Sequence, residues 1–210
     1  MPITIDGTGT ITGATTLAST VASPTFTTPA LGTPASGILT SCTGYAAANL
    51  PAGSVLQVVR AETAANTSGS AQIPLDNTIP QITEGFEVLT CSITPISASS
   101  KLYIVSTMYA GEASNITNSL VAALFRDSTA NAFAVSMGFM DINNLETGTP
   151  IYTSAYINST STAATTIQAR LGQVGGGGAI ILNIAMGTSR TYPVYGGVYF
   201  SSITIMEIAQ

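Results

Sequence analysis

The sequence predicts an all-β protein in which an extended N-terminal arm precedes a β-sandwich of the jelly-roll type. Ser and Thr make up about a quarter of the 210 residues, whereas the helix formers Lys, Glu and Gln are scarce. Beyond residue 53, short apolar runs separated by turn residues recur at regular spacing, as in sandwiches and barrels. A hydrophobic share of 45% beside a charged share of 7% also argues against a disordered chain.

Residues 1–53 form the predicted arm. They carry a single charged side chain, Asp6, within a run rich in Thr, Pro and Gly. Large apolar residues are too sparse in this segment to fill a core, and fixing each residue costs roughly 1–2 kcal/mol of backbone entropy. We therefore expect the arm to become ordered only against partner chains. A flexible linker is the alternative.

About nine strands are predicted in the sandwich domain, residues 54–210. The first is apolar at most positions and is followed by a polar loop, 63–69. A Ser-rich turn, 97–100, joins the next two, and the polar segment 126–130 forms a hairpin loop between the fourth and fifth. The remaining strands are further apolar runs, one of which follows a Gly-rich tip at 175–178. We expect strands at 54–61, 87–97, 101–110, 119–125, 131–139, 151–157, 165–171, 179–185 and 197–208.

Alternation of side chains along a strand indicates which residues share a face. In the strand at 101–110 both faces are apolar, which is typical of sheets that are covered on both sides. The two faces carry Leu102, Ile104 and Met108 on one side and Tyr103, Val105 and Tyr109 on the other.

The strand at 131–139 has one bulky face and one small face. We expect the bulky face to supply the sandwich core and the small face to let another surface approach closely, which favours an oligomer. A central strand in a larger monomeric sandwich is the alternative. The bulky face carries Phe133, Val135, Met137 and Phe139, and the small face carries Ala132, Ala134, Ser136 and Gly138.

The composition excludes most catalytic designs. Because the chain contains no His, it has no Ser-His-Asp arrangement and no ordinary proton shuttle near neutral pH. We expect no catalytic residue, no metal ion and no cofactor. Two cysteines, Cys42 and Cys91, are too few for a disulfide framework and are interpreted as small buried residues, with their redox state left open.

Carboxylates are the remaining candidates for chemistry. A glycan-degrading enzyme needs two facing carboxyl groups, and the sequence cannot place Asp76, Glu84 or Glu87 in that way. The segment 141–144 could hold Ca²⁺ through its oxygen atoms, but a solvated loop is the favoured interpretation.

Charge and hydropathy also limit the kinds of partner that the chain is expected to bind. The net charge of -5 offers no basic field for a phosphate backbone, so no nucleic-acid partner is expected. The most apolar stretch, 179–186, is interrupted by Asn183 and is far shorter than a membrane-spanning helix, and the first residues, MPITID, do not read as a secretory signal. We therefore expect no membrane insertion.

Two parts of the chain resemble bacteriophage tail-fibre and fibre-like virion proteins. The segment SPTFTTPALGTPASGILTSCTG, residues 23–44, resembles the Thr/Pro/Gly segment that recurs in tail fibres ahead of a terminal β domain. The second part is similar to the C-terminal β domain of such proteins. This chain departs from long fibres in having only about fifty residues before that domain. The similar pieces are 73–81, 83–85, 92–95, 99–102, 123–132, 196–197 and 201–208.

The resemblance implies a non-enzymatic structural protein of the phage particle surface, made in the host cytoplasm. It implies a homotrimer, a short tail fibre or spike that presents its β domain for host attachment. The alternative is a capsid decoration or cement protein, a head fibre that stabilises the shell. The arm would attach to tail, baseplate or capsid proteins through Phe26, Leu31, Ile38 and Leu39. Contacts with a host glycan or surface protein are expected from Tyr152, Tyr156, Tyr192 and Tyr195.

Overall fold

The computed structural model describes residues 50–112, 119–139, 148–175, 178–184 and 194–210. The chain divides into two units, Met1–Thr43 and Gly44–Gln210, and all described residues belong to the second. The predicted arm contacts Phe26, Leu31, Ile38 and Leu39, together with Cys42, Tyr192 and the segment 141–144, lie outside the described residues.

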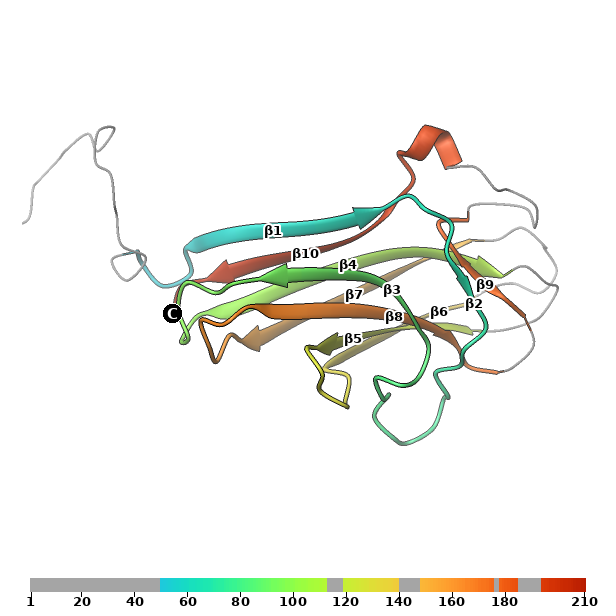
Figure 1. Cartoon of the computed structure of the whole chain (residues 1–210), viewed down its shortest axis with the longest axis horizontal. Coiled ribbons are helices and arrows are strands. Elements are labelled where there is room, and N and C mark those ends of the chain that lie inside the picture. Colours follow the sequence, from blue (N-terminus) through green and yellow to red (C-terminus); the bar gives the residue numbers. More distant parts are fainter. Residues whose placement is uncertain (1–49, 113–118, 140–147, 176–177, 185–193) are drawn as a thin grey trace, which may run out of the picture. The chain divides into compact units, whose positions relative to one another are not determined.

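The described residues are almost entirely β, as predicted (Figure 1). Each of the nine predicted strands corresponds to an observed strand, and one short strand at residues 68–69 was not predicted. The strands are β1 (Val55–Thr63), β2 (Ser68–Gly69), β3 (Phe86–Ile93), β4 (Lys101–Glu112), β5 (Ser119–Arg126), β6 (Ala134–Phe139), β7 (Thr149–Asn158), β8 (Thr165–Gln173), β9 (Ile180–Leu182) and β10 (Ser201–Ile208).

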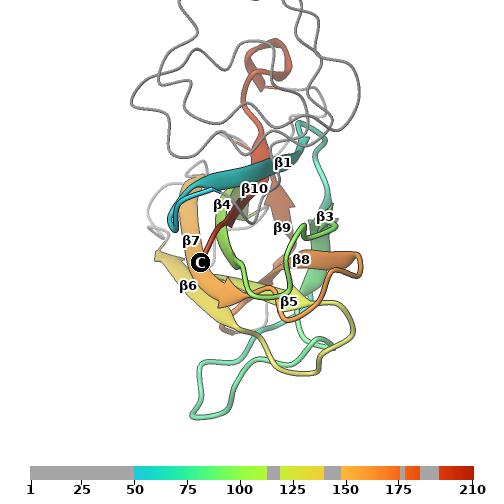
Figure 2. The ribbon, with the colours of Figure 1, turned by 90° about the vertical axis from the view of Figure 1, so that its left-hand side faces the viewer.

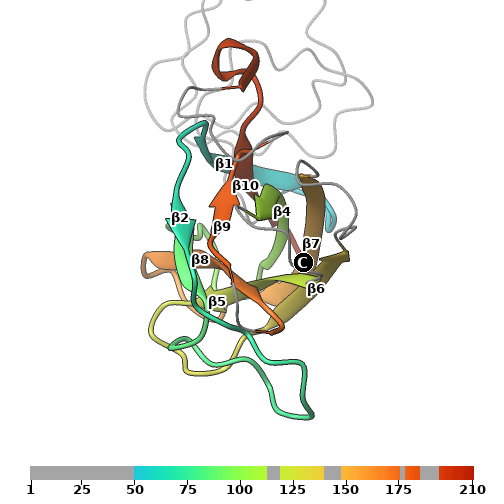
Figure 3. The same ribbon diagram turned by 90° about the vertical axis from the view of Figure 1, so that its right-hand side faces the viewer.

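The strands form two antiparallel sheets that pack face to face (Figure 2). The six-stranded sheet has the order β1-β10-β4-β9-β2, with β7 also paired to β4, and the four-stranded sheet has the order β3-β8-β5-β6. Because Ala110 pairs with both Thr149 of β7 and Leu182 of β9, β9 lies on the edge of β4 opposite to β7. Strands β2 and β9 close one end of the sandwich (Figure 3).

The eight long strands are nested as in a jelly roll. The outermost pair is β1 with β10, followed by β3 with β8 and β4 with β7, and the innermost pair is the hairpin β5 with β6. The four nested pairs can be regarded as one long antiparallel hairpin that is folded over itself. Because of this folding, successive pairs alternate between the two sheets, which gives the β-sandwich that the sequence predicts.

The core lies between the sheets and is formed by alternate residues of each strand. Leu102, Ile104 and Met108 of β4 are fully buried, as expected for one face, whereas Tyr103 on the other face is 39% exposed. The core cluster also contains Leu120, Ala122, Leu124, Ile151, Ile167, Ala169, Leu171, Ile180, Leu182, Ile203 and Ile205.

The prediction for the faces of β6 was wrong. Val135, Met137 and Phe139 are 45%, 40% and 73% exposed, and Gly138 of the small face is buried. A Cβ atom at Gly138 would lie 2.9 Å from Thr149 Cγ2 and 3.1 Å from Ile151 Cγ1, so β6 and β7 approach too closely for a bulky inward side chain. Phe133, which precedes the strand, does pack against the core.

A second, smaller core lies on the outer side of the four-stranded sheet. The segment 70–82 crosses this side (Figure 2), and its Ile73 packs with Val121 and Phe125 of β5. A Cβ atom at Gly172 of β8 would lie 2.5 Å from Ile73 Cγ1 and 2.8 Å from the Ile73 backbone nitrogen. Glycine is therefore what allows this segment to lie against β8.

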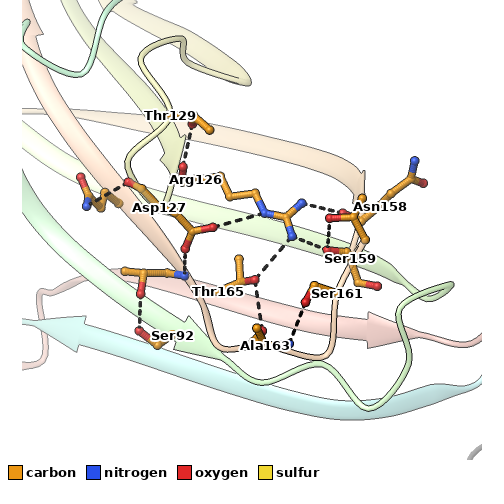
Figure 4. A network of polar contacts seen from close by, with 12 residues as sticks. Ser92, Arg126, Asp127, Thr129, Asn158, Ser159, Ser161, Ala163 and Thr165 are labelled. Carbon is orange, nitrogen blue, oxygen red and sulfur yellow. Dashed lines mark hydrogen bonds and ion pairs between the residues drawn. The ribbon is translucent and has the colours of Figure 1, made fainter.

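Arg126 fastens two turns together at the end of the sandwich that holds the C-terminus (Figure 4). Its guanidinium donates to the carbonyl oxygens of Asn158, at 2.8 Å, and Ser159. Asp127, which has a φ of 52°, accepts a hydrogen bond from the Thr166 amide at 2.8 Å. The predicted hairpin loop after β5 is thus bound to the turn between β7 and β8.

The carboxylate of Glu207 fastens the neighbouring turn, 96–100. Its side chain is fully buried and accepts hydrogen bonds from the Ile96 and Ser97 amides, at 2.9 and 3.0 Å, and from Ser100 Oγ at 2.6 Å. Gln57 Nε2 donates to it at 2.6 Å. Burial raises the pKa of Glu207, but these hydrogen bonds together outweigh burial and hold the pKa below its ordinary value.

Candidate ligand-binding face

Tyrosine side chains gather on the outer face of the six-stranded sheet. Strand register places Tyr103 of β4 opposite Tyr156 of β7, and Thr107 of β4 opposite Tyr152. Tyr152 and Tyr156 are 62% and 54% exposed. Since alternate residues of one strand point the same way, Tyr109 of β4 shares this face. We call this surface the tyrosine face; it comprises Tyr103, Tyr109, Tyr152, Tyr156, Tyr195 and Tyr199.

One end of the tyrosine face is concave. Tyr109 and Tyr199 line it, with ring centroids 4.5 Å apart. Arg60 also lines it and lies over the ring of Phe200, 5.3 Å from its centroid. The pocket has a volume of about 270 Å³ and is lined by Arg60, Thr107, Tyr109, Val198, Tyr199, Phe200 and Ser202.

A tight turn presents Tyr195 beside this pocket. The 3₁₀ segment η2 (Val194–Gly197) lies beside the end of the sheet that holds β2 and β9 (Figures 1 and 3). Tyr195, Gly196 and Gly197 have φ values of 50°, 67° and 92°. This left-handed run explains why β10 begins at Ser201 instead of the predicted residue 197. The Tyr195 ring, 77% exposed, contacts the Tyr199 ring edge-on at 6.5 Å.

Two phenols in the pocket have raised pKa values. Burial raises the pKa of Tyr109, and its hydrogen bond with Tyr152 raises it further. Burial likewise raises the pKa of Tyr199, followed by the neighbouring phenols Tyr109, Tyr152 and Tyr195. At neutral pH these hydroxyl groups therefore remain uncharged and able both to donate and to accept hydrogen bonds.

The other end of the tyrosine face carries Lys101. Its ammonium group lies 5.9 Å from the centroid of the Tyr156 ring and donates to Asn158 Oδ1. Tyr156 and Tyr103 lie with their ring centroids 6.4 Å apart. Aromatic rings and one cation therefore meet at each end of the face.

Two of the four predicted contact residues converge on the pocket. Tyr152 and Tyr195 both interact with the pair Tyr109–Tyr199, Tyr156 lies at the other end of the face, and Tyr192 lies outside the described residues. Sequence reasoning missed Tyr109, Tyr199 and Arg60 as site residues. Alternation in 101–110 had already placed Tyr109 on the same face as Tyr103 and could have identified it, whereas Tyr199 and Arg60 carry no local signal.

The carboxylates considered for catalysis have structural partners. Glu84 Oε2 accepts a hydrogen bond from the Gln81 amide at 2.9 Å, and Glu87 lies 4.0 Å from Arg170. Asp76 accepts from Thr78 within its own turn. No group of three or more His, Cys, Asp or Glu side chains in the described ranges could hold a metal ion.

Cys91 is buried, as predicted; it is a free thiol, and burial raises its pKa. No helix within the described part of the chain is long and apolar enough to cross a membrane.

Neither the scan of protein-family models nor the search of curated proteins finds a match to the chain. Among solved structures, Eiger TNF from S. frugiperda is similar at 9% identity with a TM-score of 0.43, over 73% of this chain and 92% of that chain. Infectious bursal disease virus, Gx strain, is similar at 12% identity with a TM-score of 0.32, over 73% of this chain and 38% of that chain. At these scores neither likeness assigns a function to the chain.

Proposed function

We propose that the chain is a non-enzymatic structural protein of a bacteriophage particle, a short tail fibre or spike whose β domain acts as a homotrimer in host attachment. The observation that carries this proposal is an exposed apolar patch on the outer side of the four-stranded sheet. Large exposed patches of this kind mark protein contacts in soluble proteins. The apolar patch comprises Leu75, Ile79, Val135, Met137 and Phe139.

Part of the apolar patch is grooved. Leu75 on the segment 70–82 and Val135 and Met137 on β6 line one hollow of about 270 Å³. Phe139, 73% exposed, is the next outward residue of β6. A second copy of the chain offers aliphatic side chains of the same kind, so self-association would remove these groups from water.

The neighbouring sheet edges support the same contact. In the described part of the chain β6 pairs only with β5, and β7 pairs only with β4. Neither β6 (AVSMGF) nor β7 (TPIYTSAYIN) carries a charged residue. Natural proteins protect open edges with charges or cover them. If neighbouring copies of the chain cover both edges, neither edge needs a charged residue. That the assembly contains three copies is proposed from the resemblance to fibre proteins.

A trimer would present three copies of the tyrosine face. Linked weak sites raise the overall avidity by roughly 10²–10⁴ without any new contact. The tyrosine face suits such a role because Tyr offers a large apolar ring together with a hydroxyl group.

Imaging of the phage particle by cryo-electron microscopy tests the proposal. We expect density for this chain at the tail, as trimers, with the β domain pointing outward. Density spread over the head lattice would favour the alternative role of a capsid decoration protein. Absence of the chain from purified particles would overturn both.

A further inference from the structure

We infer that the tyrosine face binds an acidic polysaccharide, whose carboxylates are held at one end by Arg60 and at the other by Lys101. The inference rests on the proposed attachment function and names the class of ligand that the same surface would take.

The contacts of the cationic side chains are the first observation that supports the inference. Arg126 donates hydrogen bonds to the backbone carbonyl oxygens of Asn158 and Ser159. Arg170 donates to those of Glu84 and Gly85. These two guanidinium groups thus fasten loops. Arg60 and Lys101, by contrast, each lie over an aromatic ring of one outer face. Of the four Lys and Arg residues in the described part of the chain, the two that lie on this face are therefore the ones not used to fasten loops.

The lining of the face indicates a sugar. Flat aromatic rings offer apolar platforms on which the C–H groups of a pyranose ring can pack. Around them the pocket is lined by the hydroxyl-bearing residues Thr107 and Ser202, beside the phenols of Tyr109 and Tyr199. Such groups both donate and accept, as sugar hydroxyl groups do.

The spacing of the cations indicates a chain of sugars. Arg60 pairs in register with Thr204, which pairs with Val105, four residues along β4 from Lys101. These offsets correspond to about 13 Å along the strand and about 10 Å across two strand spacings. A single monosaccharide cannot reach both positions, whereas an oligosaccharide with several carboxylates can, and it would reach the Lys101 end of the face, where Tyr103 and Tyr156 lie.

Arg60 is available for such a ligand. Its ion pair with Glu62 measures 3.0 Å, but the two side chains are 46% and 56% exposed. Exposed pairs contribute little to stability, so a ligand carboxylate can take the place of Glu62. The planar guanidinium can bind a carboxylate through two parallel hydrogen bonds.

Titration of the full chain with a hexamer of galacturonic acid tests the inference, with the carboxyl-reduced hexamer as the neutral match. We expect the acidic hexamer to bind at least tenfold more tightly by isothermal calorimetry, and its affinity to fall as salt rises because salt screens the charges. Absence of binding at millimolar hexamer, equal affinity for the two hexamers, or equal affinity for hexaglutamate would each overturn it.

Two variants assign the binding to this face. Arg60→Gln should weaken binding of the acidic hexamer about tenfold or more, as expected for the loss of a hydrogen bond between charged groups. Glu62→Gln, the matched control, should leave the affinity unchanged or raise it. An unchanged affinity in Arg60→Gln, with an unaltered melting curve, would overturn the inference.

The results of these experiments distinguish a failure of the inference from a failure of the proposed function. A protein found as a trimer on the phage tail that binds no acidic hexamer would retain the proposed function and lose its ligand class. A protein absent from the particle would lose the proposed function even if the hexamer binds to the tyrosine face.

Discussion

The two outer surfaces of the sandwich differ in chemistry although the same alternation of side chains generates both. The tyrosine face mixes rings, hydroxyl groups and the cations Arg60 and Lys101, so it can meet a polar ligand while remaining in water. The apolar patch exposes the large apolar side chains of Val135, Met137 and Phe139, so its exposure is costly until another surface covers it. The comparison teaches that one surface is suited to reversible recognition and the other to permanent assembly.

The largest expected effect comes from a charge in the apolar patch. Met137→Lys would bury an unpaired ammonium group in the contact between copies, so the trimer should dissociate to monomers. Light scattering measures the change as a threefold drop in mass. Val58→Lys, at a position 54% exposed on β1 of the other sheet, is the matched control and should keep the trimer. If the Met137→Lys variant remained a trimer, the apolar patch would not be part of the contact between copies.

The next effect concerns the anchor beneath the Lys101 end of the tyrosine face. Because the pKa of Glu207 is lowered in the fold, its stabilising contribution is present above the ordinary pKa of a glutamate and is lost as pH falls through the folded value. Glu207→Gln should lower the free energy of unfolding by about 2 kcal/mol near pH 7 and by less in acid.

Chemical denaturation at several pH values measures this difference. The gap between wild type and Glu207→Gln should narrow as the pH falls from about 7 to about 3. A gap that is constant over this range would mean that the carboxylate charge of Glu207 does not stabilise the turn 96–100.

A smaller effect is expected from Gly172→Ala. The added methyl group would clash with Ile73 and lift the segment that carries Leu75 of the apolar patch. We expect a loss of about 1–3 kcal/mol in stability and weaker self-association, with unchanged hexamer affinity per site. Urea denaturation and sedimentation measure the first two. If self-association proved independent of Gly172, the segment 70–82 would not belong to the contact.

The smallest effect is a gain in stability. Ser106 and Thr153 lie directly opposite each other on β4 and β7, both are buried, and neither hydroxyl oxygen has a hydrogen-bond partner. Thr153→Val keeps the shape and removes one unsatisfied hydroxyl group, so it should raise the free energy of unfolding by about 1 kcal/mol. Thermal denaturation checks the sign, and a destabilised variant would indicate that the hydroxyl group is bonded.

Local patterns predicted most of the strands but not the direction of their faces. Alternation identified which residues of β4 share a side, but because both sides are apolar it did not identify which side faces the core. For β6 the same reasoning failed, because what decides its inward face is the close approach of Thr149 and Ile151 to Gly138, residues that lie on another strand. The strand β2, two residues long, is too short to produce a periodic signal.

The candidate site was predictable only in part for the same reason. Tyr152 and Tyr195 were predicted as contacts because exposed tyrosines commonly bind ligands, and not from a local pattern around either residue. Arg60 reaches the pocket because β1 pairs with β10, and Tyr199 because η2 turns the chain back toward β4. These are long-range consequences of the nested strand order, which no local pattern in the sequence contains.

Sedimentation equilibrium of the full chain at micromolar concentration tests most directly whether the apolar patch is an assembly surface. The account predicts a single species with three times the chain mass of 21.3 kDa. A stable monomer that keeps Val135, Met137 and Phe139 in water would contradict it.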